Sequence, residues 1–267
     1  MTTWFKEIPK NEKGKDWIVG DIHGQYDALI LALKHINFDK SKDRLFSVGD
    51  LVDRGPKVFD CLRLLKEPWF FAVKGNHENM FLTKFGKAGW LHPLDLIRAY
   101  LYGDSHAIKA LVSVSEMQEL MKLIKDLPLV LKVNNEDLPF WIVHAQRPMK
   151  KNIIWTDEDL LQKGKVRFYD KDVLKVTWNR KILKDLGKKN KLILPYNKTS
   201  PFEVISSLPE YNMEDNVGLT YSGHTVLNEV IMHRSHIFID GGLYKGGILR
   251  LIDHSLLVKD MNLTKKR

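Results

Sequence analysis

Three short polar motifs, each of which follows an apolar run, limit the possible folds of this chain more than any other feature. The motifs are GDIHG at residues 20–24, GDLVDRG at 49–55 and GNHE at 75–78. The apolar runs before them cover residues 17–19, 45–48 and 70–73. A short apolar run that ends in glycine is typical of a buried strand followed by a turn. We therefore expect three strands, each with candidate metal ligands at its carboxyl end.

The segments between the motifs have the pattern of amphipathic helices. Apolar residues recur at i, i+3, i+4 and i+7 in both segments, namely Leu29, Ala32, Leu33 and Ile36, then Val58, Cys61, Leu62 and Leu65. Pro56 suits the first position of the second helix. This alternation predicts a βαβαβ unit with parallel strands, and hence an α/β fold. Ligands bind at the carboxyl edge of such sheets, so the motifs are expected to converge there.

Two later histidines occur in the same context as the motifs. His144 follows the apolar run 140–143, and His224 follows the run 219–222 through Gly223. A lone histidine at the end of a strand is usually structural, but the three earlier motifs favour a role in a shared site. The remaining histidines lack this context and are interpreted as surface or structural residues: His35, His92, His106, His233, His236 and His254. Asp, Asn and His side chains on one edge indicate a site for more than one metal ion.

Composition sets the outer limits. The chain has 267 residues, of which 44% are hydrophobic, enough for one large α/β domain or two small ones. No convincing linker or repeat divides it, so we expect a single domain over residues 1–267. No stretch approaches a membrane span, and the polar segment 1–16 does not resemble a signal peptide. The single cysteine, Cys61, lies on a helix stripe and is expected to pack in the core, which favours a cytoplasmic setting without disulfides.

Together, these motifs resemble the phosphoprotein phosphatase family of metallophosphoesterases. The similarity is greatest to its bacterial and bacteriophage branch, which includes the phage lambda Ser/Thr protein phosphatase. Further matches are the segments DLPL at 126–129, WNR at 178–180 and IDGG at 239–242. The resemblance implies a calcineurin-like β-sandwich flanked by helices. It also implies a dinuclear metal site at the carboxyl edge of the strands.

The resemblance assigns a ligand set to the two metal ions. Asp21 and His23 would hold the first ion and Asp50 would bridge both, while the second ion would be completed by Asn76, His144 and His224. A bridging ligand needs two oxygens, which only a carboxylate supplies, and a neutral amide oxygen limits the negative charge around the pair. The ions expected are two divalent cations, Mn²⁺ in the first place, with Fe or Zn as alternatives. The positive centre that results would attract a phosphate dianion.

The same resemblance assigns the catalytic residues. A hydroxide bridging the metals would attack the phosphorus directly. His77 would be the general acid for the leaving oxygen, and Asp53 would orient its ring. Arg54 and Arg180 would bind the phosphate oxygens. A structural salt bridge is the alternative for Arg54, and a surface position in a lysine-rich stretch is the alternative for Arg180.

The chain departs from these relatives in two places. Residues 150–198 form a longer, basic insertion with 14 Lys and Arg against 6 Asp and Glu, a difference of +8 in a chain of formal charge +9. It is either a basic rim that attracts acidic phosphoproteins or nucleic acid, or a solvated lysine-rich surface, with residues 188–191 as a loop tip. Gln146 and Arg147 follow His144 and Ala145 directly, and this position predicts a long cationic side chain beside the metals.

Three functions are compatible with this sequence. The first is a phosphomonoesterase for phosphoserine and phosphothreonine, with specificity that could be broad. The second is a symmetrical dinucleoside tetraphosphate hydrolase or nucleotide phosphodiesterase. Such relatives commonly lack the acid at Asp53 and carry Asp in place of Glu78, so both positions favour the phosphatase. The third is a nucleic-acid-binding module on an inactive scaffold, which the complete ligand set disfavours.

Overall fold

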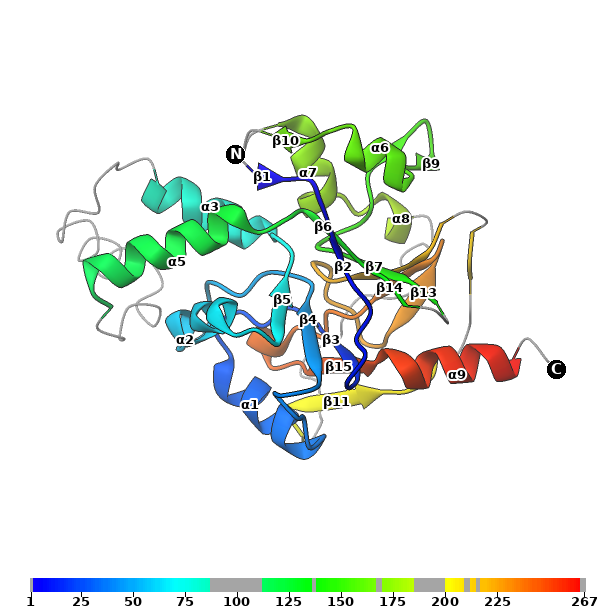
Figure 1. Ribbon diagram of the computed structural model, residues 1–267, viewed down its shortest axis with the longest axis horizontal. Helices are drawn as coiled ribbons and strands as arrows, with labels where there is room; N and C mark the ends of the chain where they lie inside the picture. The colour runs from blue at the N-terminus through cyan, green and yellow to red at the C-terminus, as the bar shows by residue number, and fades with distance from the viewer. Residues whose placement is uncertain are drawn as a thin grey trace.

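The structure is a computed structural model of the chain, and it describes residues 2–86, 112–135, 138–166, 170–184, 200–208, 212–214 and 217–264. Its centre is a sandwich of two β-sheets (Figure 1). The apolar side chains between the sheets come from both of them, for example Ile18 and Phe46 from one sheet and Phe140 and Ile142 from the other. The expected β-sandwich is confirmed.

The first sheet carries the three motifs. Its strand order is β11-β15-β3-β4-β5. The strands cover Phe202–Ile205 (β11), Leu249–Asp253 (β15), Asp16–Val19 (β3), Arg44–Ser47 (β4) and Phe70–Ala72 (β5). Strands β3, β4 and β5 are parallel neighbours, and Val19, Ser47 and Ala72 lie in register. The expected βαβαβ unit is therefore present, and it brings the three motifs to one edge.

The second sheet carries the two later histidines. Its order is β13-β14-β12-β7-β6-β2. The strands cover Ile231–His233 (β13), His236–Phe238 (β14), Leu219–Ser222 (β12), Phe140–Val143 (β7), Val130–Val133 (β6) and Phe5–Ile8 (β2). Because β7 and β12 are parallel neighbours, His144 and His224 leave the sheet at the same edge. Two small ribbons pair Thr2–Thr3 (β1) with Lys165–Val166 (β10) and Met149–Lys150 (β8) with Ile153–Ile154 (β9).

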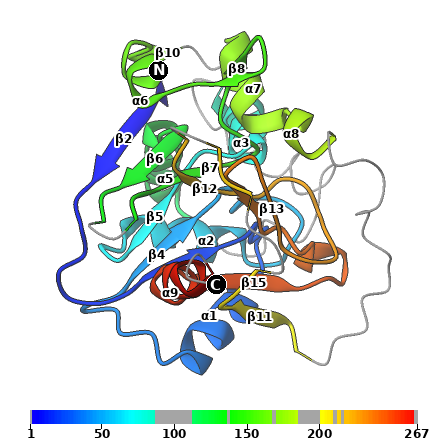
Figure 2. The same cartoon turned by 90° about the vertical axis from the view of Figure 1, so that its right-hand side faces the viewer.

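Helices cover the outer faces of both sheets (Figures 1 and 2). Tyr26–His35 (α1), Val58–Arg63 (α2) and Val114–Asp126 (α5) pack on the first sheet. Asp157–Leu161 (α6) and Lys171–Trp178 (α7) pack on the second sheet. The other described helices are Leu64–Lys66 (η1), Asn76–Gly86 (α3), Lys181–Lys184 (α8), Leu243–Lys245 (η3) and His254–Thr264 (α9).

The helix predictions are confirmed with one correction. Leu29, Ala32 and Leu33 are buried on α1, and Cys61 is buried on α2. Pro56, however, precedes α2 instead of occupying its first position. The reason is tertiary, because the amides on either side of it, at residues 55 and 57, donate to carbonyls of the first motif at residues 23 and 24. In the part of the chain that the structure describes, no helix is both long and apolar enough to cross a membrane.

Candidate metal centre

Asp50 lies at the centre of the polar cluster on the edge that both sheets share. Its Oδ2 is 3.5 Å from Nε2 of His23, and its Oδ1 is 3.4 Å from Nε2 of His144. Two groups of possible metal ligands share it: His23, Asp50 and His77, and Asp50, His144 and His224, with donor atoms within 4.8 Å of one another in each group. The two oxygens of one carboxylate therefore face two separate sets of ligands, as a bridging ligand must.

Asn76 joins the second of these groups. Its Oδ1 lies 2.7 Å from Nε2 of His144 and 3.0 Å from Nδ1 of His224. Nδ1 of His144 donates to the carbonyl of Val48 at 2.8 Å, so Nε2 of that neutral ring carries a lone pair. The His144 nitrogen and the Asn76 oxygen are then both acceptors at hydrogen-bond distance. A shared cation resolves this conflict, and the residues present fit a metal ion.

The ionisation of the cluster also fits metal binding. Burial raises the pKa of Asp50 to about 6 and lowers the pKa of His144 to about 3. Burial likewise lowers the pKa of His23 well below its usual value. Metal ions bind ionised carboxylates and neutral imidazoles. The raised pKa of Asp50 means that a positive charge nearby is needed to keep this carboxylate ionised, and the lowered pKa values keep His144 and His23 neutral.

Asp21 lies outside both donor groups but contacts the second one. Its two carboxylate oxygens accept the backbone N–H of His224 at 3.2 and 3.1 Å. A Cβ atom at Gly223 would lie 1.9 Å from Asp21 Oδ1, so only glycine permits this approach. The pKa of Asp21 is raised well above its usual value, first by burial and then by the charges of Asp240 and Asp50. Asp240, in the IDGG segment, is a buried acid to which the sequence assigned no role.

His77 lies at the side of the cluster, between an acid and an arginine. Its Nδ1 is 2.7 Å from Oδ2 of Asp53, and its Nε2 is 3.0 Å from an Nη of Arg54. Burial lowers the pKa of His77, but the hydrogen bond to Asp53 and the charges of Asp50 and Asp53 outweigh it, and the pKa is raised. Nε2 of His77 is 3.9 Å from Asp50. The arrangement provides a proton donor whose second nitrogen is fixed by a carboxylate.

Several of these residues have a left-handed backbone conformation, with a positive φ. Among the residues of the site, those with φ between 46° and 75° are His23, Asp50, Asp53, Arg54 and His224. A left-handed conformation costs a non-glycine residue roughly 1–3 kcal/mol, and such residues concentrate at functional sites. Buried Glu78 stabilises the second motif, because its carboxylate accepts the backbone N–H of Gly75, Asp50 and Leu51 at 2.7–2.8 Å.

Arg180 reaches the cluster from the insertion. It lies between α7 and α8, and its Nε donates to Oγ1 of Thr225 at 3.1 Å. Its charge contributes to the lowered pKa of both His144 and His224, although burial is the larger cause. Trp178, at the end of α7, lies with its ring centroid 5.7 Å from that of His224. The insertion therefore contributes directly to the rim of the centre.

The prediction that Arg147 lies beside the metals is wrong. This side chain is only 2% exposed, and its guanidinium donates to the carbonyl of Trp155 and to Asp157. It also lies 5.2 Å from the centroid of the Trp141 ring. The charge thus has a structural function between β7 and α6, away from the cluster.

The basic insertion is only partly described. Lys163 and Lys175 both form ion pairs with Asp172 at 2.7 Å. Residues 167–169 and 185–199, which include the expected loop tip at 188–191, lie outside the described residues. The hypothesis of an acidic or nucleic-acid partner stays a prediction.

Tyr244, in η3, is a neighbour of the cluster that the sequence did not indicate. Its ring centroid is 4.6 Å from that of His23, and the Arg54 guanidinium carbon lies 3.8 Å from it. Contact of a guanidinium with an aromatic face is favourable and restricts the arginine to one orientation. No spacing pattern marks this residue, so its place follows only from the tertiary structure.

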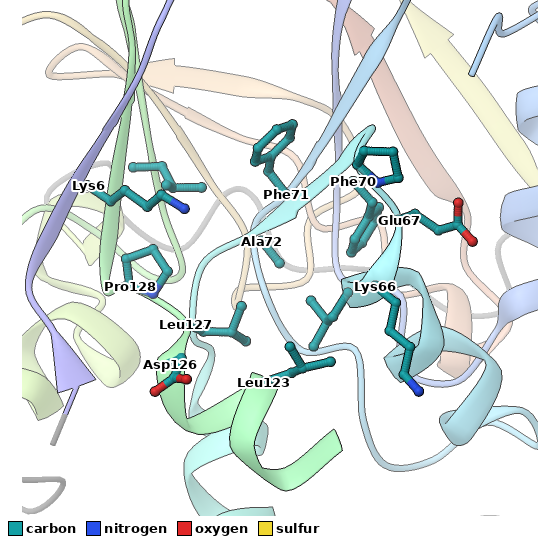
Figure 3. Close-up of a pocket in the computed structure, with 13 residues that line it drawn as sticks. Lys6, Lys66, Glu67, Phe70, Phe71, Ala72, Leu123, Asp126, Leu127 and Pro128 are labelled. Carbon is teal, nitrogen blue, oxygen red and sulfur yellow. The ribbon is translucent and has the colours of Figure 1, made fainter. Parts of the chain in front are cut away.

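A separate pocket lies between η1, β5 and the end of α5 (Figure 3). Apolar side chains such as Phe71 and Leu123 line it beside Lys66 and Asp126. None of the predicted metal ligands or catalytic residues contributes to this lining. The DLPL match borders it, and the Pro128 carbonyl accepts the backbone N–H of residue 74 just before the GNHE motif, so this match has a structural explanation.

Comparison with known proteins assigns the family. The model of the calcineurin-like phosphoesterases matches residues 15–228, and the chain belongs to this family. It is therefore a hydrolase of the metallophosphoesterase class, as the motifs indicated.

Several relatives have names that state an activity. Serine/threonine-protein phosphatase 2 of Escherichia coli (strain K12) is 36% identical over 153 residues, which cover 55% of this chain and 65% of that protein. Serine/threonine-protein phosphatase 2 of Salmonella typhimurium (strain LT2) is 30% identical over 237 residues, which cover 87% of this chain and 89% of that protein. A symmetrical bis(5'-nucleosyl)-tetraphosphatase of Enterobacter sp. (strain 638) is 34% identical over 117 residues, or 43% of this chain and 41% of that protein.

The fold also has a counterpart among solved structures. A protein provisionally named a diadenosine tetraphosphatase superposes with a TM-score of 0.54 at 19% identity, over 93% of this chain and 92% of that one. At this identity the likeness concerns the fold alone.

Proposed function

We propose that this protein is a metal-dependent phosphomonoesterase that acts on phosphoserine and phosphothreonine side chains. The observation that supports this most is the 2.7 Å contact of His77 with Asp53, next to the shared carboxylate of Asp50. A protein monoester has a poor alkoxide leaving group, and such a group needs a proton donor. The phosphatase names of two relatives agree with this proposal.

In the proposed mechanism six residues would hold two divalent ions, with Mn²⁺ as the expected metal. These residues are Asp21, His23, Asp50, Asn76, His144 and His224. When bound, the ions lower the pKa of a water molecule and stabilise negative charge on the phosphoryl group. The protein's own task is to orient the substrate and to move the proton.

Arg54 and Arg180 perform the first task. Each guanidinium offers a planar pair of N–H donors that matches two phosphate oxygens. An Nη of Arg54 lies 3.0 Å from Nε2 of His77 in the present structure, so the guanidinium has to leave this contact for a phosphate oxygen when substrate binds. That exchange leaves Nε2 free to face the leaving oxygen.

His77 performs the second task. Its Nε2 donates a proton to the departing alkoxide while Asp53 accepts the hydrogen bond from Nδ1. Asp53 thereby fixes the orientation of the ring and favours its protonated form.

A substrate panel tests the proposal. Protein stripped of metal and reconstituted with Mn²⁺ is assayed with phosphoserine, phosphothreonine and phosphotyrosine peptides and with diadenosine tetraphosphate. We expect kcat/KM to be highest for the phosphoserine and phosphothreonine peptides. A higher kcat/KM for diadenosine tetraphosphate would instead support the second candidate function, a symmetrical tetraphosphatase. That candidate is favoured by one observation, the half-exposed ring of Trp178 beside His224, which offers a surface for a nucleobase.

A further inference from the structure

The residues that follow His144 hold the segment that carries Arg180. The backbone N–H of Ala145 donates to the carbonyl of Val176 at 2.9 Å, which fixes the last turn of α7. The side-chain carbonyl of Gln146 accepts the backbone N–H of Ile182 at 3.1 Å, which fixes the first turn of α8. Residues 145 and 146 therefore hold the chain on both sides of Arg180.

Gln146 is built into the protein interior. Neither Gln146 nor Ile182 has measurable exposure to solvent. The other end of the Gln146 amide donates to Sδ of Met149 at 3.3 Å. An amide suits this position because it is a neutral acceptor, whereas a carboxylate would bury a charge and an apolar side chain would leave the Ile182 N–H unpaired.

Arg180 itself depends on such support. It lies in the two-residue connection between α7 and α8, its side chain is exposed, and it donates to the hydroxyl of Thr225. Helix α8, which follows directly, spans only Lys181–Lys184, and so short a helix is not stable by itself. A buried acceptor at the start of α8 is therefore well placed to fix where the arginine leaves the backbone.

We infer that Gln146 is a positioning residue for Arg180. By accepting the Ile182 N–H, it holds the arginine at the His224 side of the metal centre, in the place from which its guanidinium can bind the phosphoryl group. The inference rests on the proposed function, since it requires that Arg180 binds the substrate phosphate.

A double-mutant cycle tests this inference. Gln146→Met has nearly the same length and removes the acceptor, and Met149→Leu is the matched control because it removes the other partner of the same amide. In the metal-reconstituted protein with p-nitrophenyl phosphate, we expect Gln146→Met to lower kcat/KM about tenfold, by misplacing a charge-assisted contact. Met149→Leu should leave kcat/KM within about twofold of the parent protein, because one weak sulfur contact is lost.

The cycle is completed with Arg180→Ala. If Gln146 acts through Arg180, Gln146→Met should cause no further loss of kcat/KM in the Arg180→Ala background. A loss of the same size in both backgrounds would overturn the inference, since it would show that Gln146 acts on the centre by another route, such as the neighbouring His144. A wild-type kcat/KM for Arg180→Ala would refute the proposed role of the arginine itself, so the two failures are distinguishable.

Two measurements separate positioning from general damage. The metal content of Gln146→Met should match that of Met149→Leu, and inhibition by inorganic phosphate should weaken only in the former. Ile182→Pro removes the same hydrogen bond from the donor side, at a first-turn position where proline is tolerated. It should reproduce the loss if Gln146→Met does not fold, and unchanged kcat/KM in Ile182→Pro would overturn the inference.

Discussion

The replacement His77→Asn separates acid catalysis from metal binding. His77 belongs by distance to one possible ligand group with His23 and Asp50, yet its Nε2 is 3.9 Å from Asp50 and its Nδ1 is bonded to Asp53. In the proposed mechanism it is an acid and not a ligand. We therefore expect His77→Asn to bind the same number of metal ions as the parent protein and to lose activity with alkyl phosphates.

The expected loss follows from the proton that His77 supplies. General acid catalysis contributes about 10²–10⁴-fold, which corresponds to about 2.7–5.5 kcal/mol of transition-state stabilisation. The high end is favoured here, because the Nδ1 contact of 2.7 Å to Asp53 orients the ring and raises its pKa. An aryl phosphate such as p-nitrophenyl phosphate has an acidic leaving group and should lose much less.

The assay compares kcat for a phosphoserine peptide and for p-nitrophenyl phosphate, with metal content determined on the same samples. The matched control is Asn79→Ala, a change two residues further along α3 that leaves the ring untouched. Equal losses for the alkyl and aryl substrates would refute the role as an acid. Loss of one metal ion from His77→Asn would show that the histidine is a ligand instead.

Other perturbations also have expected outcomes. Chelation should abolish hydrolysis and Mn²⁺ should restore it, and Asp50→Asn should weaken binding of both ions, measured by calorimetric metal titration. Tyr244→Ala should raise KM by releasing Arg54, whereas Tyr244→Phe, which keeps the ring, should not; equal effects would argue against stacking. Arg180→Lys should lower kcat/KM about ten- to a hundredfold at both low and high salt. A loss that disappears at high salt would show that Arg180 contributes only a general electrostatic attraction for the substrate. Burial lowers the pKa of His236 to about 3, so below about pH 6.5 this residue binds a proton in the unfolded state but not in the folded one. The free energy of unfolding should therefore fall by up to about 1.4 kcal/mol for each pH unit by which the pH is lowered in this range. When the pH is lowered from about 7 to about 5.5, the free energy of unfolding in urea should fall by about 1 kcal/mol less for His236→Gln than for the parent protein. An equal fall in both proteins would refute this linkage.

The sequence predicts the parts of this fold that local patterns encode. Apolar runs that lead into a polar motif or a histidine correctly marked β3, β4, β5, β7 and β12, and helical spacing marked α1 and α2. The parallel pairing of the motif strands follows from their alternation with helices, and the shared edge follows from that pairing. For the same reason the sequence places the candidate ligands of the three motifs at one edge.

Tertiary contacts decide the features that the sequence did not predict. Arg147 is close to His144 along the chain, but the direction of its side chain is set by Trp155 and Asp157, which belong to a later segment. The position of Pro56 depends on hydrogen bonds to the first motif. Tyr244 meets Arg54 although 189 residues lie between them in the sequence. None of these relations has a local period or a spacing that a sequence pattern could reveal.

Glu78, at a position where tetraphosphatase relatives commonly carry Asp, has a structural role that depends on the length of its side chain. Its two oxygens accept backbone N–H groups of Gly75, Asp50 and Leu51, and Asp50 has a left-handed φ of 53°. The carboxylate thus helps to hold the strained turn that directs Asp50, the candidate ligand common to both donor groups. Aspartate is shorter by one carbon–carbon bond of about 1.5 Å, so it could not reach all three amides unless the turn moved. The choice of Glu or Asp at this position is therefore coupled to the placement of Asp50, and hence to the geometry of the whole centre.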